Sequence, residues 1–343
     1  MAILFIGAVA LAAPPPATNI SFSSGFTDHM VLQRGAMSNV YGFAPTAHPV
    51  MVRVLGVDAA GAKVSYVLAA TLAPQTAQGF YPRGAPPVHG AFTWRVALRA
   101  ATGGVYTITA NDGSQNASIS DVVIGDVYFC SGQSNMALET FYTFSADTLK
   151  AEVRAGKWRN IRHFMFGSMG GQYLATEPQW VSSLQTNDGD PLSTNSWHTL
   201  EVSAARPSLN NATGAHSAFA QFSATCMYFA VELVRATGDT TTPIGVIQSA
   251  IGGSQIESWM DNTTLTECAN ESLTGGAVPE DSGRLFYGMV APFVNTSVSG
   301  WLWYQVCVGV SPAGLVAART MRPRPDSLFS SSSSSSSSSL TAG

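Results

Sequence analysis

Short runs of β-branched and aromatic residues alternate with turn residues through the first third of the chain. The runs that predict strands are residues 50–55 (VMVRVL), 64–68 (VSYVL), 92–98 (FTWRVAL) and 105–110 (VYTITA). Gly, Pro, Asn and Asp separate them. Several short strands at this spacing are typical of a small all-β sandwich. No titratable side chains stand at a catalytic spacing here, so the chemistry is expected further along the chain.

The pattern changes near Ser120. Residues 121–130 (DVVIGDVYFC) form a near-continuous apolar run, as expected for a strand buried on both faces of a parallel sheet. Residues 244–247 (IGVI) and 301–304 (WLWY) predict two further strands of this kind. Residues 217–235 predict a helix that ends before Gly238, because apolar residues recur at steps of three and four. They are Phe219, Phe222, Cys226, Phe229 and Leu233. The alternation predicts an α/β fold, a parallel sheet with helices on both faces.

A serine lies in a glycine-containing turn directly after the first of these strands. The turn reads Ser131-Gly132-Gln133-Ser134-Asn135-Met136 and precedes a predicted helix. Such a turn presents Ser134 Oγ at the carboxyl edge of the sheet, where backbone N–H groups at a helix start can hold an oxyanion. The pattern fits equally a serine that only caps the helix.

A second loop, Gly252-Gly253-Ser254, follows the strand at residues 244–247. Paired glycines let backbone amides approach a ligand closely. On its own the pair indicates an ordinary turn. Its position after a second parallel strand makes it a candidate oxyanion donor, because active sites lie at the carboxyl ends of such strands.

These two loops resemble sequence blocks of the sialate O-acetylesterase family, a branch of the SGNH hydrolases. Residues 127–136 (VYFCSGQSNM) resemble the nucleophile block, and residues 243–247 (PIGVI) with 252–259 (GGSQIESW) resemble the second block. Further segments match in the same order: residues 26–34 (FTDHMVLQR), 222–229 (FSATCMYF), 287–292 (YGMVAP) and 302–305 (LWYQ). The resemblance implies an SGNH-hydrolase-like, flavodoxin-like sheet over residues 121–305, preceded by a β-sandwich-like domain over residues 19–120.

The resemblance also implies roles for residues. Ser134 would be the nucleophile of a serine esterase that removes O-acetyl groups from sialic acids or other acetylated glycans. Its amide and the Gly252-Gly253 pair would form part of the oxyanion hole. Supporting motif residues are Gly132, Gln133, Asn135 and Gln305. An acetylxylan-type polysaccharide deacetylase would use the same nucleophile chemistry.

The sequence departs from the family after Gln305. The family has Gly-Glu and then an oxyanion Asn there, and later an Asp-x-x-His that supplies the base; this chain has Val306-Cys307-Val308. The six histidines are His29, His48, His89, His163, His198 and His216, so none lies where the family places its base. We expect His163 to be a core or surface residue, and no catalytic Asp or His is found.

Three hypotheses follow. The chain is an active esterase, a catalytically inactive relative that binds a sugar, or an incomplete or mis-spliced form of a full enzyme. The third is favoured, because residues 306–343 turn abruptly into an Arg/Pro stretch and a polyserine tract that is expected to be disordered. In that case an uncovered sheet edge predicts poor folding, and the missing base predicts negligible turnover.

The beginning of the chain indicates secretion or the endomembrane lumen. Residues 1–13 combine an apolar run with an A-x-A-like site, as a signal peptide does, and the run is too short for stable membrane insertion. Six N-x-[ST] sequons agree with this: Asn19, Asn116, Asn211, Asn262, Asn270 and Asn295. Cys130 and Cys226 are expected to be buried free thiols, and the absence of C-x-x-C spacing argues against structural zinc.

Composition narrows the partners. The formal net charge is −4 and charged residues make up 11% of the chain, with no basic cluster in the globular part. Nucleic acid is therefore excluded as a partner, since phosphate binding needs a concentrated basic face. No cofactor is implied, because neither a P-loop nor a dinucleotide fingerprint is present.

Overall fold

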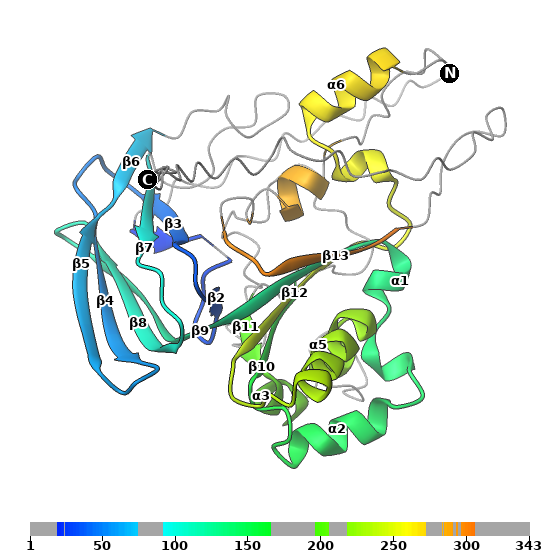
Figure 1. Ribbon diagram of the computed structural model, residues 1–343. Helices are drawn as coiled ribbons and strands as arrows, with labels where there is room; N and C mark the ends of the chain where they lie inside the picture. The colour runs from blue at the N-terminus through cyan, green and yellow to red at the C-terminus, as the bar shows by residue number, and fades with distance from the viewer. Residues whose placement is uncertain are drawn as a thin grey trace, which may run out of the picture. The chain divides into compact units, whose positions relative to one another are not determined.

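The computed structural model describes residues 19–23, 25–74, 92–165, 196–205, 218–271, 283, 285–290, 293 and 296–305. They form two β-sheets flanked by helices (Figure 1). The smaller sheet is antiparallel and has the order β1 (Ser21–Phe22), β3 (Ser38–Ala44), β7 (Phe92–Leu98), β6 (Thr71–Pro74). The predicted signal peptide, residues 1–13, and the tail, residues 306–343, lie outside the described residues.

The larger sheet joins sandwich strands to parallel strands. Its order is β11 (Trp197–Thr199), β10 (Ile161–Met165), β12 (Ile244–Ala250), β9 (Asn116–Gly132), β8 (Gly104–Asn111), β4 (Met51–Asp58), β5 (Lys63–Ala69). Two more strands, β2 (Val31–Gln33) and β13 (Gly300–Tyr304), also pair with β9. The sheet is mixed: β10, β12, β9 and β13 run parallel, whereas β11 is antiparallel to β10.

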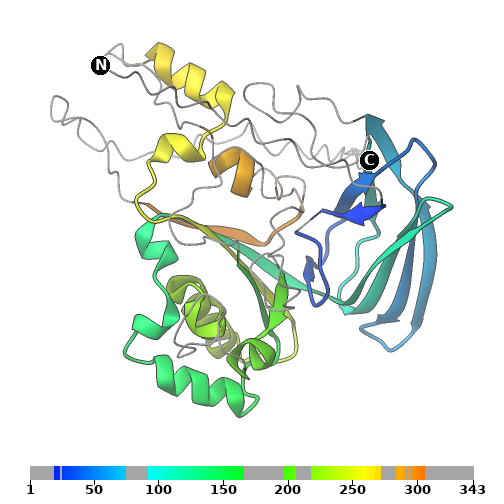
Figure 2. The same ribbon diagram turned by 180° about the vertical axis from the view of Figure 1, so that it is seen from behind.

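The longest strand, β9, belongs to both parts of this sheet (Figure 2). Its first half pairs antiparallel with β8, and its second half pairs parallel with β12 and β13. The change of pattern near Ser120 therefore falls inside one strand. The proposed division into residues 19–120 and 121–305 stays a prediction.

The strands expected in the first third are confirmed as β4, β5, β7 and β8. Their alternation has a clear cause: in β4 the even-numbered residues Val52 and Val54 are buried, and their odd-numbered neighbours are exposed. The buried residues share one core cluster with Trp94 and Val96 of β7. The two sheets thus face each other as a sandwich does.

The three apolar strands expected in the second part are confirmed as the second half of β9, β12 and β13. All seven residues of β12 are buried, which explains its unbroken apolar sequence. The strand β10 was not predicted, because Arg162 and His163 interrupt its apolar pattern.

The helices are short. The second longest, α6 (Asn262–Glu271), follows the glycine loop, and four others gather on one side of the parallel strands (Figure 1). They are α2 (Ala146–Arg154), α3 (Leu200–Ala205), α4 (Ala218–Gln221) and α5 (Ala224–Thr237), and their buried residues share a core cluster with Ile244 and Val246 of β12. The other face of β9 packs on Trp259, Met289 and Phe293. Helices on both faces of the sheet stay a prediction.

The single helix expected over residues 217–235 is wrong in one respect, because α4 and α5 are separate. Ser223 between them is not helical (φ −48°, ψ 120°) and forms an antiparallel bridge with Glu139. Phe229 and Leu233 are only half-buried, and Met227, Ala230 and Val231 form the buried stripe instead. The predicted end is confirmed: Gly238 is the left-handed C-cap of α5 (φ 67°).

Within the described residues, no helix combines the length and the apolar character needed to cross a bilayer.

Candidate active site

Ser134 lies on a turn that follows the carboxyl end of β9. It is the first residue of α1 (Ser134–Ala137), and Gln133 occupies the N-cap position without a side-chain cap hydrogen bond. The alternative that Ser134 is a capping serine is therefore wrong. Ser134 is exposed, so its hydroxyl is accessible to a ligand. The backbone N–H groups of Ser134 and Asn135 lie in the first turn of α1. N–H groups in a first turn have no hydrogen-bond acceptor within the helix itself.

The turn before Ser134 requires a glycine. Gly132 has φ 138°, and a Cβ there would overlap the carbonyl of Tyr304 in β13. The neighbouring Gln133 N–H donates to that carbonyl (3.0 Å). These contacts hold the start of the nucleophile turn against β13.

The second predicted loop lies beside the first. A Cβ built on Gly252 would lie 3.7 Å from both Cα and Cβ of Ser134, in ordinary van der Waals contact. The loop is tied to β9 at its base, where Ile251 N–H donates to Gly132 O (3.1 Å). Gly252 and Gly253 are both exposed. Parallel pairing of β9 with β12 puts the two loops at the same sheet edge, as the sequence predicted.

Ser254 holds the glycine loop in place. Its hydroxyl donates to Ile251 O (2.7 Å) and accepts from the indole N–H of Trp259 (2.9 Å) in η3 (Ile256–Trp259). Its carbonyl accepts from Gln305 Nε2 (3.1 Å), directly after β13. Trp259 also packs edge-on against Trp303. Ser254 and Trp259 had no predicted role, because nothing local in the sequence indicates that they meet.

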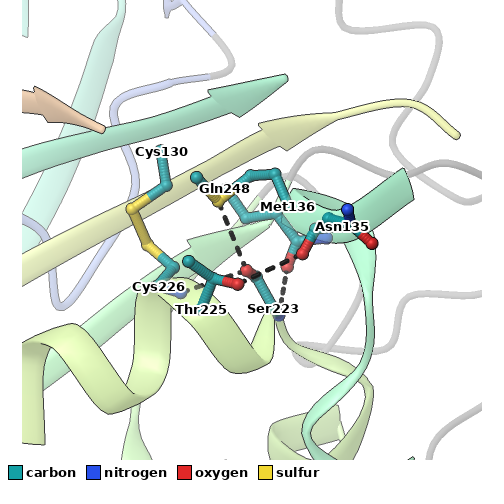
Figure 3. Close-up of a disulfide and its surroundings, with 7 residues drawn as sticks. All are labelled: Cys130, Asn135, Met136, Ser223, Thr225, Cys226 and Gln248. Carbon is teal, nitrogen blue, oxygen red and sulfur yellow. Dashed lines mark hydrogen bonds between the residues drawn. A yellow bond between two sulfur atoms is a disulfide. The ribbon is translucent and has the colours of Figure 1, made fainter. Parts of the chain in front are cut away.

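A disulfide joins Cys130 at the end of β9 to Cys226 in the first turn of α5, with 6.0 Å between their Cα atoms (Figure 3). The prediction of two buried free thiols is therefore wrong. Both residues are fully buried, as expected, but the β9 and α5 backbones bring them to bonding distance across 96 positions of sequence. The disulfide lies four residues before Ser134 and fixes α5 to the strand that carries it.

The first turn of α5 also contacts the nucleophile turn directly (Figure 3). Thr225 Oγ1 donates to Asn135 O (3.1 Å), and Ser223 Oγ contacts Met136 Sδ (3.7 Å). Ser223 is itself held by its N–H, which donates to Gln248 Oε1 in β12 (2.6 Å). Ser223 and Gln248 were missed from the sequence, since a buried polar pair carries no periodic signal.

Comparison with known proteins identifies the family. Residues 124–311 match the model of the family described as "Carbohydrate esterase, sialic acid-specific acetylesterase". This chain belongs to that family. The matched segment contains Ser134, the glycine loop and both cysteines of the disulfide.

Curated relatives in the sialate O-acetylesterase family support this membership. The sialate O-acetylesterase of Homo sapiens is 27% identical over 231 residues, which covers 62% of this chain and 38% of the human protein. The sialate O-acetylesterase of Mus musculus is 27% identical over 254 residues, which covers 62% of this chain and 41% of the mouse protein. The chain thus spans about two fifths of the length of these relatives.

A solved structure shares the fold. A carbohydrate acetylesterase from Xanthomonas citri superposes with a TM-score of 0.53 at 22% sequence identity, covering 84% of this chain and 51% of that chain. This similarity supports the mixed sheet described above.

A histidine that serves as the base for Ser134 has to lie within hydrogen-bond reach of its hydroxyl. His29 Nδ1 lies 2.7 Å from Asp121 Oδ2. Asp121 precedes Gly132 by 11 positions on β9, which corresponds to about 36 Å of strand. His48 is exposed in the turn before β4, in the sandwich. Neither histidine is placed to serve Ser134.

His163 is a core residue, one of the two positions expected for it. It is buried on β10, and its Nε2 lies 2.9 Å from Ser203 Oγ. Burial, together with the nearby His198 ring, holds the pKa of His163 well below its usual range, so the ring is neutral. His163 pairs with Val246, four residues before the end of β12, and His198 pairs with His163. His89 and His216 lie outside the described residues.

Proposed function

We propose that this chain is a serine esterase that removes O-acetyl groups from sialic acids or related acetylated glycans. The observation that carries the proposal is the position of Ser134, exposed on the first turn of a helix and in contact distance of the Gly252 loop. Membership of the carbohydrate esterase family supports it. We also propose that the catalytic sheet has the SGNH arrangement, with helices on both faces.

The proposed chemistry proceeds in two steps. Ser134 Oγ attacks the acetyl carbonyl carbon while a base takes its proton, and the ester bond breaks to release the sugar hydroxyl and leave an acetyl-enzyme. Water then attacks the acetyl-enzyme, releases acetate and restores the Ser134 hydroxyl. The Ser134 amide and the amides of Gly252 and Gly253 would stabilise the oxyanion in both steps.

No described residue is identified as the base that takes the proton of Ser134. Because none of the four described histidines lies beside Ser134, we propose that this sequence turns over slowly. In serine hydrolases that lack triad members, oxyanion donors and binding alone leave about 10³–10⁴-fold catalysis over water. Added imidazole should substitute for the base.

The test measures acetate release from 9-O-acetyl-N-acetylneuraminic acid by the purified chain. We expect slow release that rises with imidazole concentration and disappears in Ser134→Ala at every imidazole concentration. A matched control is Ser145→Ala, another exposed serine next to a helix start, which should behave as the unchanged chain. Release that persists in Ser134→Ala would refute Ser134 as nucleophile. Faster release from acetylated xylan would redirect the substrate to plant polysaccharides.

A second candidate is sugar binding without turnover, favoured by the lack of a histidine beside Ser134 among the described residues. Calorimetric titration with N-acetylneuraminic acid separates the two. Saturable binding without any Ser134-dependent acetate release would support the sugar-binding alternative.

We further propose that the protein works in an oxidising compartment, as a secreted or luminal glycoprotein. The Cys130–Cys226 disulfide supports this, because such bonds persist mainly outside the cytosol. The sequon residues Asn19 and Asn116 are exposed and accessible to glycosylation. Expression in secretory cells followed by glycosidase treatment should lower the apparent mass; an unchanged mass would count against glycosylation.

A further inference from the structure

The sandwich contains a cavity remote from Ser134. Its volume is about 400 Å³, within the range of small-molecule sites. It lies between the inner faces of β4, β5, β8 and β9 on one side and the segment that follows β7, residues 99–103, on the other. No residue of the nucleophile turn or the glycine loop contributes to its wall.

Within the described residues, the inner side chains at one edge of the sandwich are only partly covered. Val54 of β4 is buried, whereas Val64 and Tyr66, which point inward from the neighbouring β5, are only half-buried. In the part of the chain that the structure describes, β5 is the last strand of its sheet.

The deep wall of the cavity is apolar. Val54, Leu98, Ile108 and Val122 line it, and each is at most 4% exposed. These side chains offer no hydrogen bonds to water. This part of the wall favours an apolar group of an occupant over water or a polyol, whose hydroxyl groups would lose hydrogen bonds on entry. Polar side chains, among them Gln33, Ser38 and Thr102, line the remainder of the cavity.

One positively charged side chain, Arg99, lies at the edge of the cavity. The Arg99 guanidinium lies 4.6 Å from the centroid of the Tyr66 ring, and Arg99 is exposed. Within the described residues it forms no ion pair. Burial raises the pKa of Tyr66 despite the opposing effects of the Arg99 backbone hydrogen bond and charge, so the phenol stays neutral beside the guanidinium. The Arg99 charge is thus available to an incoming anion.

The one acidic side chain in the wall, Asp58, lies at the other end. Val54 pairs with Tyr66, and Asp58 is four residues further along β4, about 13 Å away. Asp58 Oδ1 accepts hydrogen bonds from the amides of Ala60 and Ala62, both 2.9 Å, in its own turn. An anionic group is therefore favoured at the Arg99 end and disfavoured at the Asp58 end.

We propose that this cavity binds a small carboxylate with an apolar body. The apolar body lies against Val54, Leu98 and Ile108, and the carboxylate pairs with Arg99 at the edge. This site is separate from the Ser134 site, so its test does not depend on esterase activity.

The experiment is calorimetric titration of the full chain with octanoate, and with 1-octanol as a neutral probe of the same length. We expect one saturable site for both. Arg99→Gln should weaken the binding of octanoate about fivefold, which corresponds to one partly exposed ion pair. The binding of 1-octanol should not change. Arg53→Gln is the matched control, because Arg53 is exposed and points away from the cavity on β4.

A second pair of variants tests the location. Val64→Phe fills the cavity from β5 and should abolish binding of both probes, whereas Val67→Phe, on the outer face of the same strand, should leave it intact. Should Val64→Phe fail to fold, Ala101→Leu fills the same cavity from the segment after β7. Undiminished octanoate binding in a folded cavity-filling variant would overturn the proposal. So would the absence of octanoate binding, or a preference of this cavity for N-acetylneuraminic acid.

Discussion

Cys130 and Cys226 are joined by a disulfide that fixes the first turn of α5 to the end of β9, four residues before Ser134. The nucleophile turn therefore rests on a covalent link between two elements that are far apart in sequence. The same α5 turn contacts Asn135 and Met136. The position of Ser134 consequently depends on α5 as well as on its own strand.

The first prediction concerns this link. Reduction, or the double substitution Cys130→Ala/Cys226→Ala, should lower the free energy of unfolding by about 2–4 kcal/mol, because the closed loop constrains the unfolded chain. Urea unfolding with and without dithiothreitol measures it. The double variant is its own control, since a reductant should not shift its midpoint further. A midpoint of the unchanged chain that is insensitive to dithiothreitol would contradict the prediction.

The second prediction compares two serines before helices. Ser223 Oγ accepts from Cys226 N–H (3.2 Å) at the start of α5, whereas Ser145 before α2 makes no side-chain cap hydrogen bond. Ser223→Ala should cost about 1 kcal/mol of unfolding free energy, and Ser145→Ala should cost little. Thermal unfolding of the two variants under identical conditions tests this. Equal losses would show that the cap hydrogen bond contributes nothing.

The third prediction separates the two glycines of the candidate oxyanion loop. Gly253 has φ 77°, a conformation that strains an alanine, while Gly252 has no such φ and has room for a Cβ beside Ser134. Gly253→Ala should therefore destabilise the protein by about 1–2 kcal/mol more than Gly252→Ala. Chemical unfolding of both variants provides the measurement. A larger cost for Gly252→Ala would mean that the loop is arranged differently.

The fourth prediction concerns acid stability. Burial raises the pKa of Asp121, but hydrogen bonds from His29 and Arg162 and the Arg162 charge outweigh it, and the net pKa falls below 3.8. A carboxylate with a lowered folded pKa stabilises the fold above its unfolded pKa, and this contribution is lost as the pH falls through the folded value. The free energy of unfolding should thus decline below about pH 4. This decline should be less steep in Asp121→Asn than in the unchanged chain.

Unfolding free energies measured between pH 6 and pH 3 test this expectation. Asp147→Asn, which removes an exposed carboxylate in the first turn of α2, is the control and should keep the slope of the unchanged chain. An identical slope in Asp121→Asn would show that the Asp121 ion pairs do not govern acid stability.

Much of the fold was predictable because the signals are local. The alternation in β4 and the unbroken apolar run of β12 follow from which faces are buried, and both strands were expected. The strand β10 was not predicted, because Arg162 and His163 interrupt its apolar pattern and meet their partners only in the tertiary structure. The break between α4 and α5 was missed for the same reason: Ser223 leaves the helix to meet Glu139 and Gln248.

Some features of the candidate site likewise have a local signal in the sequence, and others do not. The sequence by itself determined the serine turn after a buried strand, the paired glycines after a second strand, and the family, because each is a contiguous motif. Only the tertiary structure decided that Gly252 lies against Ser134, that Ser254 is held by Gln305 and Trp259, and that Cys130 is bonded to Cys226. The physical reason is that these contacts join residues far apart in the chain. Their partners are set by strand register and helix packing, which no local pattern of residues records.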